Sequence, residues 1–461
     1  MRRYTLFLSL ATVALVCAAV AARSAQEVRP NVIIIQADDL GYGDISAYGQ
    51  SRFQTPSLDR LAREGMRFTN YYAGSTVCGP SRAALMTGLH TGHTWIRGNG
   101  EIPLRAEDVT VAMALRNAGY RTAVVGKWGL GRPGTPGQPD LKGFEYSFGV
   151  LDHRHAHRQF TDHLYRNAQP VTVNPADYVN DLFTREAASF IERDDARPFF
   201  LYLNYTVPHA ELRVPEDSLE PFKGAFPEKP FVNAAADGRA TGPDDQSLGY
   251  RSQAAPHAAF AAMITRMDRD IGRLVDLLTA RGIDRRTLVM FISDNGPHQE
   301  GGGDPVFFKS SGGLRGIKRD LYEGGIRVPM IARWPGTIPA ARVNDHPSTH
   351  WDIFPTLAEL ARVKTSSSVD GLSIFRTLRG QSQPPHDFLY WEFHERGFQQ
   401  AVRMGAWKAV RLAKDQPLEL YNLERDPHEE TNVASAEGTV VARIEKYLAT
   451  ARTDSPNWPV K

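Results

Sequence analysis

The chain has 461 residues, of which 42% are hydrophobic and 23% are charged, an ordinary balance for a globular protein. It is too long for one minimal domain and short for three, so we expect one large domain and a smaller one. With 54 basic and 52 acidic residues, the chain carries no basic excess of the kind that would indicate a nucleic-acid partner.

Residues 1–25 have the three parts of a secretory signal peptide. Arg2 and Arg3 form a basic start, residues 6–20 are apolar, and small residues follow up to Ala25. The alternative is a membrane anchor, but the apolar run is short for a span and no basic stop follows it. We therefore expect a periplasmic or secreted protein with no stable membrane span and, after cleavage, a net charge of −1 because three of the arginines are lost.

Cleavage would also remove Cys17 and leave Cys78 as the only cysteine. An exported protein with one cysteine has no internal disulfide. The thiol of Cys78 is then either buried and inert or used for chemistry.

Four short apolar runs, each ending in polar residues, predict strands that are buried on both faces of a parallel sheet. They are NVIIIQADD (31–39), RTAVVGKWG (121–129), PFFLYLNYTVPH (198–209) and TLVMFISDNG (287–296). Helical patterns lie between these runs, at residues 55–66, 109–120 and 259–282, and each contains or ends at a glycine. This alternation of strands and helices predicts a doubly wound α/β sheet.

The remaining segments have weaker patterns. Residues 211–257 are rich in Pro, Gly, Ala and Asp and predict an extended surface insertion. Residues 400–411 and 417–427 predict antiparallel strands, followed by a helix from about 440 to 449. With TSSS at 365–368 as a linker, we expect a catalytic domain at residues 26–362 and a C-terminal α+β subdomain at residues 363–461.

The polar residues at the ends of the predicted strands define a candidate site, because ligands of an open parallel sheet bind beyond the carboxyl ends of its strands. These residues are Asp38, Asp39, Lys127, His209, Asp294 and Asn295. Any one of them alone is more often a turn, capping or solvated residue, but four such strand ends together favour a site. Three neighbouring carboxylates would repel one another, and oxygen ligands favour Ca²⁺ or Mg²⁺ over zinc.

The stretch from Cys78 to Arg82, CGPSR, leads into an apolar run that predicts a helix, and Pro80 fits its first turn. The free amides at the start of the helix favour an anion there, and Arg82 would add a cation. The alternative is a cysteine that packs as a small apolar residue.

The segment from Cys78 to Gly88 reads C-x-P-S-R-x-x-L-x-T-G and resembles the signature of the type I, formylglycine-dependent sulfatases of the alkaline phosphatase superfamily. Further family-like blocks follow in the family's order: ADDLGYGD, GKWGLG, VPH, SDNGPH and LRGIKRDLYEGGIRVP. The likeness covers about residues 31–336 and extends more weakly through LELYNLERDPHEETN. It implies an alkaline-phosphatase-like fold, in which helices flank a large doubly wound mixed sheet beside a smaller C-terminal α+β subdomain.

The resemblance also implies a mechanism. A maturation enzyme would oxidise Cys78 to Cα-formylglycine, whose hydrate attacks the sulfur of a sulfate ester. The calcium ligands would be Asp38, Asp39, Asp294, Asn295 and residue 78. The catalytic side chains would be Arg82, which polarises the nucleophile, Lys127 and Lys318, which hold sulfate oxygens, and His209, which protonates the leaving alcohol.

One position departs from the family pattern. Many members carry a histidine at the position of Gly129, where it is thought to deprotonate the hydrate so that sulfate is expelled. We expect a substitute base among His155, His157 and His298, and favour the first two because residues two apart in an extended segment face one side. A second group follows the cysteine block and is expected to line the substrate pocket: His90, His93 and Arg97.

These observations favour hydrolysis of sulfate esters, with a sulfated carbohydrate as the preferred substrate class. One alternative is a phosphate or phosphonate monoester hydrolase of the same superfamily. Another is a catalytically inactive, calcium-dependent glycan-binding relative, which only Gly129 favours.

Overall fold

The computed structural model describes residues 29–233, 249–364 and 368–460. The predicted signal peptide, part of the predicted insertion and most of the predicted linker at 365–368 lie outside the described residues. Across these three ranges, no helix has the length and apolar character that crossing a membrane requires.

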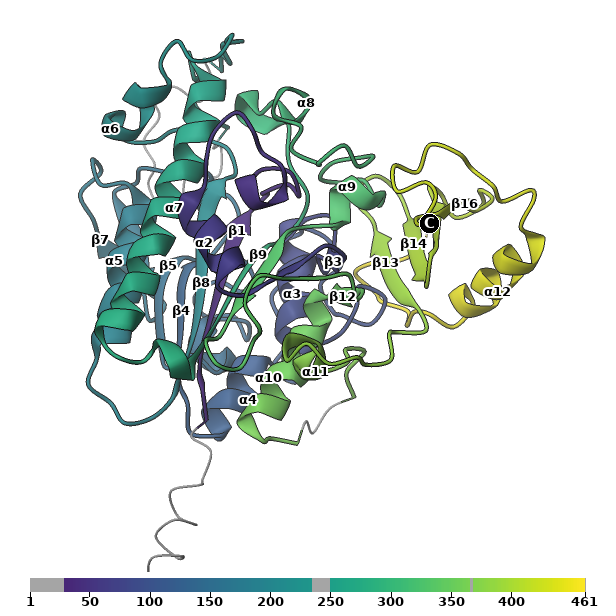
Figure 1. The fold of residues 1–461 in the computed structure, drawn as a ribbon, viewed down its shortest axis with the longest axis horizontal. Coiled ribbons are helices and arrows are strands. Elements are labelled where there is room, and N and C mark those ends of the chain that lie inside the picture. Colours follow the sequence, from purple (N-terminus) through teal and green to yellow (C-terminus); the bar gives the residue numbers. More distant parts are fainter. Residues whose placement is uncertain (1–28, 234–248, 365–367, 461) are drawn as a thin grey trace, which may run out of the picture.

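Ten strands form one mixed sheet in the order β11–β2–β10–β9–β1–β8–β4–β5–β6–β7 (Figure 1). Their bounds are β1 (Asn31–Asp38), β2 (Met66–Phe68), β4 (Arg121–Lys127), β5 (Tyr146–Val150), β6 (His163–Arg166), β7 (Gln169–Thr172), β8 (Phe199–Pro208), β9 (Thr287–Ser293), β10 (Met330–Arg333) and β11 (Arg342–Asn344). The five central strands, from β9 to β5, run parallel, whereas β10, β6 and β7 add antiparallel pairs. The four strands predicted from apolar runs are β1, β4, β8 and β9, and each is buried throughout.

Both faces of the sheet are covered by helices, as the doubly wound prediction requires. Alternate residues of β1 point to opposite sides, so Ile33 and Ile35 join one core while Val32 and Ile34 join the other. The first core includes α2 (Pro56–Arg63), α5 (Val179–Glu192) and α7 (Pro256–Ala280), and the second includes α3 (Cys78–Thr87), α4 (Val111–Asn117) and α10 (Ile353–Ala361). The three predicted helical patterns correspond to α2, α4 and α7.

Shorter elements complete this part of the chain. In its described part the predicted insertion contains α6 (Glu216–Leu219), one 3-10 turn and the first two residues of α7, and an isolated bridge pairs Phe231 with Gln253. The other short elements are β3 (Tyr71–Tyr72), paired with β12 (Ser348–Thr349), and the helices α8 (Pro305–Phe308), α9 (Glu323–Ile326) and α11 (Phe375–Leu378).

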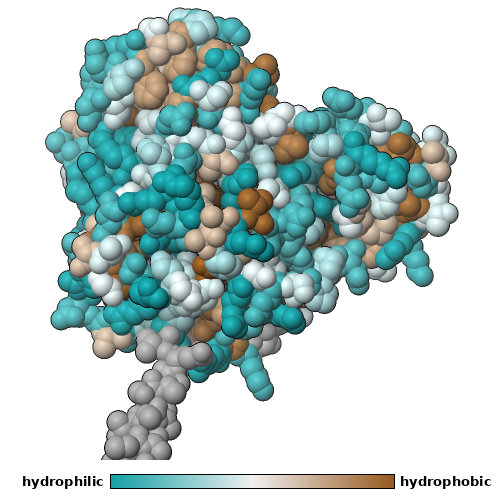
Figure 2. All heavy atoms as spheres, in the orientation of Figure 1, coloured by the Kyte–Doolittle hydropathy of each residue, from teal (hydrophilic) through white to brown (hydrophobic). Residues whose placement is uncertain are grey.

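The C-terminal region forms a smaller lobe that projects from one side of the main body (Figures 1 and 2). Four antiparallel strands, β13 (Leu389–Phe393), β14 (Gln399–Met404), β15 (Trp407–Arg411) and β16 (Glu419–Asn422), precede α12 (Gly438–Leu448). This is the α+β unit that the sequence predicts, with β13 added. The boundary at residue 363 stays a prediction. In Figure 2 the drawn face is mostly hydrophilic, with hydrophobic residues scattered over it.

Buried ion pairs attach the lobe to the main body. Lys408 of β15 lies between Glu323 of α9, at 3.0 Å, and Glu429, at 3.4 Å, and all three side chains are fully buried. Arg97 makes a second buried pair, 2.8 Å from Glu392 of β13. Because a buried charge without its partner is costly, these contacts fix the position of the lobe.

Gly126 allows the backbones of β4 and β8 to approach closely just before Lys127. It pairs with Asn204 of β8 and has a φ of +100°. A Cβ atom at this position would lie 1.8 Å from the carbonyl oxygen of Asn204. No side chain fits there, so the sheet geometry next to Lys127 depends on this glycine.

We predict that Gly126→Ala destabilises the protein far more than Gly119→Ala. Gly119 also has a positive φ, +86°, but no atom lies within 4 Å of a Cβ there, so this control carries the backbone strain without the clash. We expect Gly119→Ala to lower the free energy of unfolding by about 1–2 kcal/mol and Gly126→Ala by about 4 kcal/mol or more. Urea unfolding measures both free energies. Equal losses for the two variants would contradict the close approach of β4 and β8 at Gly126.

Candidate active site at the carboxyl edge of the sheet

The helix α3 places Cys78 at the carboxyl edge of the sheet. The helix begins at Cys78, with Pro80 in its first turn, and ends at Thr87, and the next residue, Gly88, takes the left-handed conformation. The Ser81 hydroxyl donates to the carbonyl of Asp294, and the Gly79 amide donates to Asn99 Oδ1 at 2.8 Å. The first bond holds the start of the helix against the end of β9, and the second ties it to the segment that follows α3.

Asp38 and Asp39 follow one another at the end of β1, and each is paired with a lysine. Lys127 Nζ, from the end of β4, lies 2.7 Å from Asp38 Oδ2, and Lys318 Nζ lies 2.8 Å from Asp39 Oδ2. Both carboxylates are fully buried. The residues come from three separate segments, and the parallel strands bring them to one edge.

Asp294, directly after β9, is paired with Arg82 of α3. Arg82 donates to Asp294 Oδ2 from Nη2 at 2.7 Å and from Nε at 3.1 Å, and its Nη1 donates to the Lys127 carbonyl at 2.9 Å. Its Nη2 also lies 3.6 Å from Asp38 Oδ1, and all three side chains are fully buried. Arg82 thus links α3 to the ends of three strands.

The carboxylates differ in their affinity for protons. Burial alone would raise the pKa of Asp38, but Lys127, His209 and Arg82 hold that pKa well below its ordinary value. The pKa of Asp294 is raised to about 7, first by burial and then by repulsion from Asp38, against the opposing effect of Arg82. Asp294 therefore keeps a proton up to near-neutral pH because the carboxylates repel one another. A bound cation would offset this repulsion.

The residues at this edge fit a hard divalent cation. Ligand atoms of Asp38, Asp39 and Cys78 lie within 4.8 Å of one another. Asn295 Nδ2 donates to Asp39 Oδ1 at 2.7 Å, while Asn295 Oδ1 is buried and has no hydrogen-bond partner among the described residues. Together with the three carboxylates, the Asn295 oxygen provides a set of oxygen ligands, and Ca²⁺ and Mg²⁺ prefer such ligands.

His209, after β8, faces the same cluster. Its Nδ1 donates to the carbonyl of Ala210, so its Nε2 is directed at Lys318 Nζ, 3.2 Å away, and at Asp39 Oδ2, 3.4 Å away. Burial and then repulsion by Lys318 lower the pKa of His209 to about 4, although the negative charge of Asp39 acts to raise it. The ring is therefore neutral when nothing negative is bound beside it.

Glu300 belongs to this cluster and was not predicted. Its carboxylate lies 2.9 Å from Lys318 Nζ and 3.6 Å from His209 Nε2. Burial alone would raise its pKa, but Lys318 and His209 hold it well below the ordinary value. Its position shortly after the SDNGPH block is the one sequence signal that points to it.

The predicted substitute bases separate in the structure. Residues 155–157 form a 3-10 turn and not an extended segment, so His155 and His157 do not face one side. His155 stacks on His163 with ring centres 4.4 Å apart, whereas His157 stacks on His209 at 5.0 Å. His298 packs on the same ring at 5.5 Å, and its Nε2 faces the Pro208 carbonyl at 3.0 Å.

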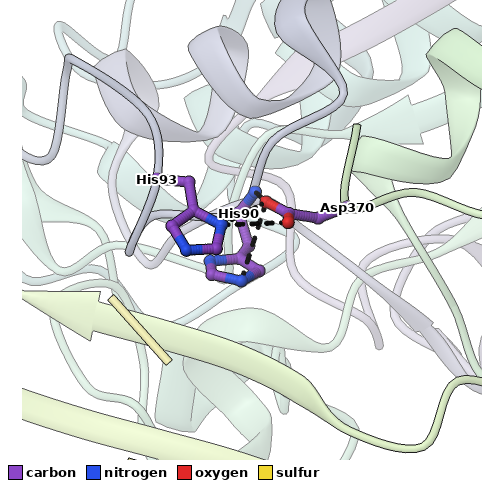
Figure 3. A group of neighbouring side chains, drawn as sticks. All are labelled: His90, His93 and Asp370. Carbon is purple, nitrogen blue, oxygen red and sulfur yellow. Dashed lines mark hydrogen bonds and ion pairs between the residues drawn. The ribbon is translucent and has the colours of Figure 1, made fainter. Parts of the chain in front are cut away.

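The residues expected to line the substrate pocket contact other side chains of the protein. Figure 3 shows His90 and His93 stacked beside Asp370, with ring centres 4.3 Å apart and His93 Nδ1 2.9 Å from Asp370 Oδ1. The His90 amide donates to the other carboxylate oxygen at 3.0 Å, and His90 Nδ1 accepts from the Gly92 amide. Arg97 is committed to Glu392, because a buried guanidinium requires a carboxylate. The role of these residues in the substrate pocket stays a prediction, and the side chain of His93 is 30% exposed.

Comparison with known protein families shows which family the chain belongs to. The family model described as Sulfatase matches residues 30–363. The chain belongs to the sulfatase family. This confirms the resemblance to the formylglycine-dependent sulfatases of the alkaline phosphatase superfamily, and a second model, N-sulphoglucosamine sulphohydrolase, C-terminal, matches residues 317–454 of this sulfatase.

Individual relatives agree with this membership. An arylsulfatase of Hemicentrotus pulcherrimus is 32% identical over 429 residues, which cover 86% of this chain and 70% of the relative. An N-acetylgalactosamine-6-O-sulfatase of Bacteroides thetaiotaomicron is 28% identical, with 92% and 93% covered. This sulfatase is accordingly a sulfuric ester hydrolase.

Solved structures give the same fold. The crystal structure of Ps i-CgsB in complex with k-i-k-neocarrahexaose has a TM-score of 0.78 and 27% identity, covering 94% of this chain and 95% of that one. The phosphonate monoester hydrolase of Agrobacterium radiobacter has a TM-score of 0.68 and 24% identity over 92% of this chain and 95% of its own, which establishes the fold alone. The predicted alkaline-phosphatase-like architecture with a small C-terminal subdomain is thus confirmed.

We predict that Arg82→Met lowers the free energy of unfolding of the metal-stripped protein by about 3–5 kcal/mol, because it leaves buried carboxylates without their cation. Arg82→Lys should lose less, since it keeps a charge but not the two-pronged contact. Urea unfolding measures the loss. The control is Arg60→Met, which breaks an exposed Arg–Asp pair of 2.8 Å and should cost less than about 1 kcal/mol. Equal losses for Arg82→Met and Arg60→Met would contradict the electrostatic role of Arg82.

Proposed function

We propose that this sulfatase hydrolyses sulfate esters of a carbohydrate, with a formylglycine made from Cys78 and a calcium ion, in the periplasm or after secretion. One observation carries the proposal: Cys78, three carboxylates and two lysines from separate segments converge on one buried edge of the sheet. Export is supported by the basic, apolar and small-residue pattern of residues 1–25.

A carbohydrate is supported by two of the similarities. The relative from Bacteroides thetaiotaomicron that matches over nearly the whole chain is named an N-acetylgalactosamine-6-O-sulfatase. The structure of Ps i-CgsB, similar over a comparable share, is a complex with k-i-k-neocarrahexaose. Both names refer to sugars, but to different ones. The proposal therefore names sulfated carbohydrates as the substrate class and no particular saccharide.

The environment of Cys78 favours a modified side chain over a working thiol. Burial raises the pKa of Cys78 well above its ordinary value, and although Lys127 opposes this effect, Asp38 adds to it. A thiol in this state is a poor nucleophile. Formylglycine, which a maturation enzyme would make from Cys78, supplies one hydrate oxygen to attack sulfur and a second to expel sulfate.

The calcium ligands would be the oxygen atoms of Asp38, Asp39, Asp294 and Asn295, together with residue 78. The unsatisfied, buried Oδ1 of Asn295 supports this assignment. Bound there, Ca²⁺ supplies positive charge that offsets the repulsion among the carboxylates and polarises the nucleophilic oxygen.

The remaining side chains have roles that follow from their charge. Lys127 and Lys318 are cations at the edge of the cluster and would bind sulfate oxygens, neutralising the charge that grows in the transition state. Arg82 orients the cluster through Asp294. His209 Nε2 faces Lys318 and Glu300. A bound sulfate ester beside this ring favours its protonated form, which can then donate a proton to the leaving alcohol.

We predict that the protein, co-expressed with a formylglycine-generating enzyme, releases sulfate from sulfated mono- or oligosaccharides. Ion chromatography measures the sulfate, and mass spectrometry of the residue-78 peptide should show the aldehyde. Phosphate and phosphonate monoesters are tested in parallel, and we expect kcat/KM to be higher for the sulfate esters.

The matched control for this experiment is Cys78→Ala, which we expect to keep the fold but lose turnover. Activity of this variant, or activity of a protein whose residue 78 remains a thiol, would rule out the formylglycine. Preference for phosphonate or phosphate esters would favour the alternative hydrolase, and binding without turnover by aldehyde-bearing protein would favour a glycan-binding relative.

We predict that calcium binding is tighter above about pH 7 than below it. The pKa of Asp294 is raised to about 7 in the metal-free site, and a protonated carboxyl competes with the metal ion. Isothermal titration calorimetry of metal-stripped protein at about pH 6 and about pH 8 measures the difference. Asp294→Asn should bind weakly at both, whereas Asp276→Asn on the surface should behave as wild type. Equal wild-type affinities at the two pH values would contradict the assignment of Asp294.

A further inference from the structure

The position that lacks the family histidine is Gly129, which lies just beyond the end of β4. The neighbouring strand β5 is in parallel register with β4, and the backbone pairing continues past both strands. The amide of Trp128 donates to the Val150 carbonyl at 2.9 Å, and that of Gly129 donates to the Leu151 carbonyl at 3.2 Å. The segment that follows Leu151 therefore runs alongside Gly129.

His153, two residues further on, places its ring in the space that a side chain at position 129 would occupy. A Cβ atom built on Gly129 would lie 2.7 Å from Cε1 of His153 and 3.3 Å from its Nδ1 and Nε2. Real Cβ contacts are not this short, so His153 in this position and a side chain at 129 exclude one another. Gly129 has a φ of +74°, which a glycine adopts without strain.

The same ring reaches the start of α3. A Cβ atom on Gly79, directly after Cys78, would lie 3.3 Å from His153 Nε2. The imidazole thus lies between position 129 and the residue that follows the cysteine.

The state of the ring suits a proton acceptor. Within the described part of the chain, His153 Nδ1 is buried and has no hydrogen-bond partner. Burial, and then the positive charges of Lys127 and Arg82, hold the pKa of His153 well below its ordinary value, so the ring is neutral. His157 Nδ1 is also buried and unpartnered among the described residues, so the position of the His153 ring beside Gly129 and Gly79 is what distinguishes it.

The other candidate histidines lack this geometry. His155 is 3.1 Å from Thr161 Oγ1 and stacks on His163, away from the charge cluster. His157 and His298 pack on the ring of His209. The ring that occupies the space next to Gly129 is that of His153.

We propose that His153 replaces the histidine missing at Gly129 and acts as the base that releases sulfate from residue 78. The inference rests on the proposed function and assigns one further catalytic residue to it. It also explains why position 129 is glycine: the two residues share one space.

The proton and electron balance of the step is simple. After sulfur transfer, residue 78 carries one sulfate-bound oxygen and one hydroxyl. His153 accepts the hydroxyl proton, and the electron pair of that O–H bond forms the C=O bond of the aldehyde. The bond between carbon and the sulfate-bearing oxygen breaks, and its electron pair leaves with sulfate dianion.

The test compares His153→Gln with the matched variant His155→Gln, both carrying formylglycine and supplied with a sulfate ester that wild type hydrolyses. Reactions are quenched in acid, and the residue-78 peptide is analysed by mass spectrometry. We expect His153→Gln to accumulate a peptide that is heavier than the hydrated formylglycine peptide by one SO3 group, and to lose about 100-fold or more in kcat. His155→Gln should resemble wild type in both measurements.

A double variant keeps the test decisive if His153→Gln is poorly folded. Gly129→His alone should place two rings in one space and lower the melting temperature. Gly129→His combined with His153→Ala should recover part of kcat and remove the sulfated peptide, and free imidazole should partly rescue His153→Ala.

The outcomes separate the two proposals. Wild type that carries the aldehyde but hydrolyses no sulfate ester contradicts the proposed function, and the inference falls with it. Wild-type turnover, together with a His153→Gln variant that accumulates no sulfated peptide and loses no more kcat than His155→Gln, contradicts only the role of His153.

Discussion

The structure around Cys78 depends on the pairing of buried carboxylates with buried cations. The pairs are Asp38 with Lys127, Asp39 with Lys318, and Asp294 with Arg82. Charges this far from solvent persist only when they are neutralised nearby, so each side chain fixes the position of its partner. The pairing also indicates the class of ligand. A divalent cation bound among the carboxylates would replace the lysines as their counter-charge. The lysines would then be available to bind an anionic ester.

The fold creates this pairing from local features. Continuous apolar runs form the central strands, and because these strands are parallel, the polar residues that follow them meet at one edge. The helix α3 then brings Cys78 and Arg82 to that edge, held by the hydroxyl of Ser81. The whole arrangement tolerates little change in backbone position, since Gly126 leaves no space between β4 and β8.

The sequence was sufficient to predict what depends on local pattern. The four buried strands, the helices α2, α3, α4 and α7, the C-terminal α+β unit and the family follow from apolar runs and ordered motifs. The short strands β5, β6 and β7 were not predicted, because brief or partly exposed strands carry little hydrophobic signal.

Contacts between distant residues were beyond sequence reasoning. The role of Arg97 depends on Glu392, a residue 295 positions away. The expectation for His155 and His157 depended on an extended backbone, and a 3-10 turn separates the two rings. His153 becomes visible only when the space above Gly129 is measured, since nothing in LDHRHAHRQF distinguishes it from its neighbours.

The C-terminal lobe supports one of the lysines of the charge cluster. Lys408 of the lobe is buried against Glu323, five residues after Lys318, so the lobe anchors the segment that carries one of the two lysines of the cluster. The two family models overlap in this stretch, between residues 317 and 363. A gene fragment that encoded the large sheet alone would keep most of the cluster and lose the support of that lysine. The smaller lobe is therefore a structural support of the charge cluster and not an independent appendage.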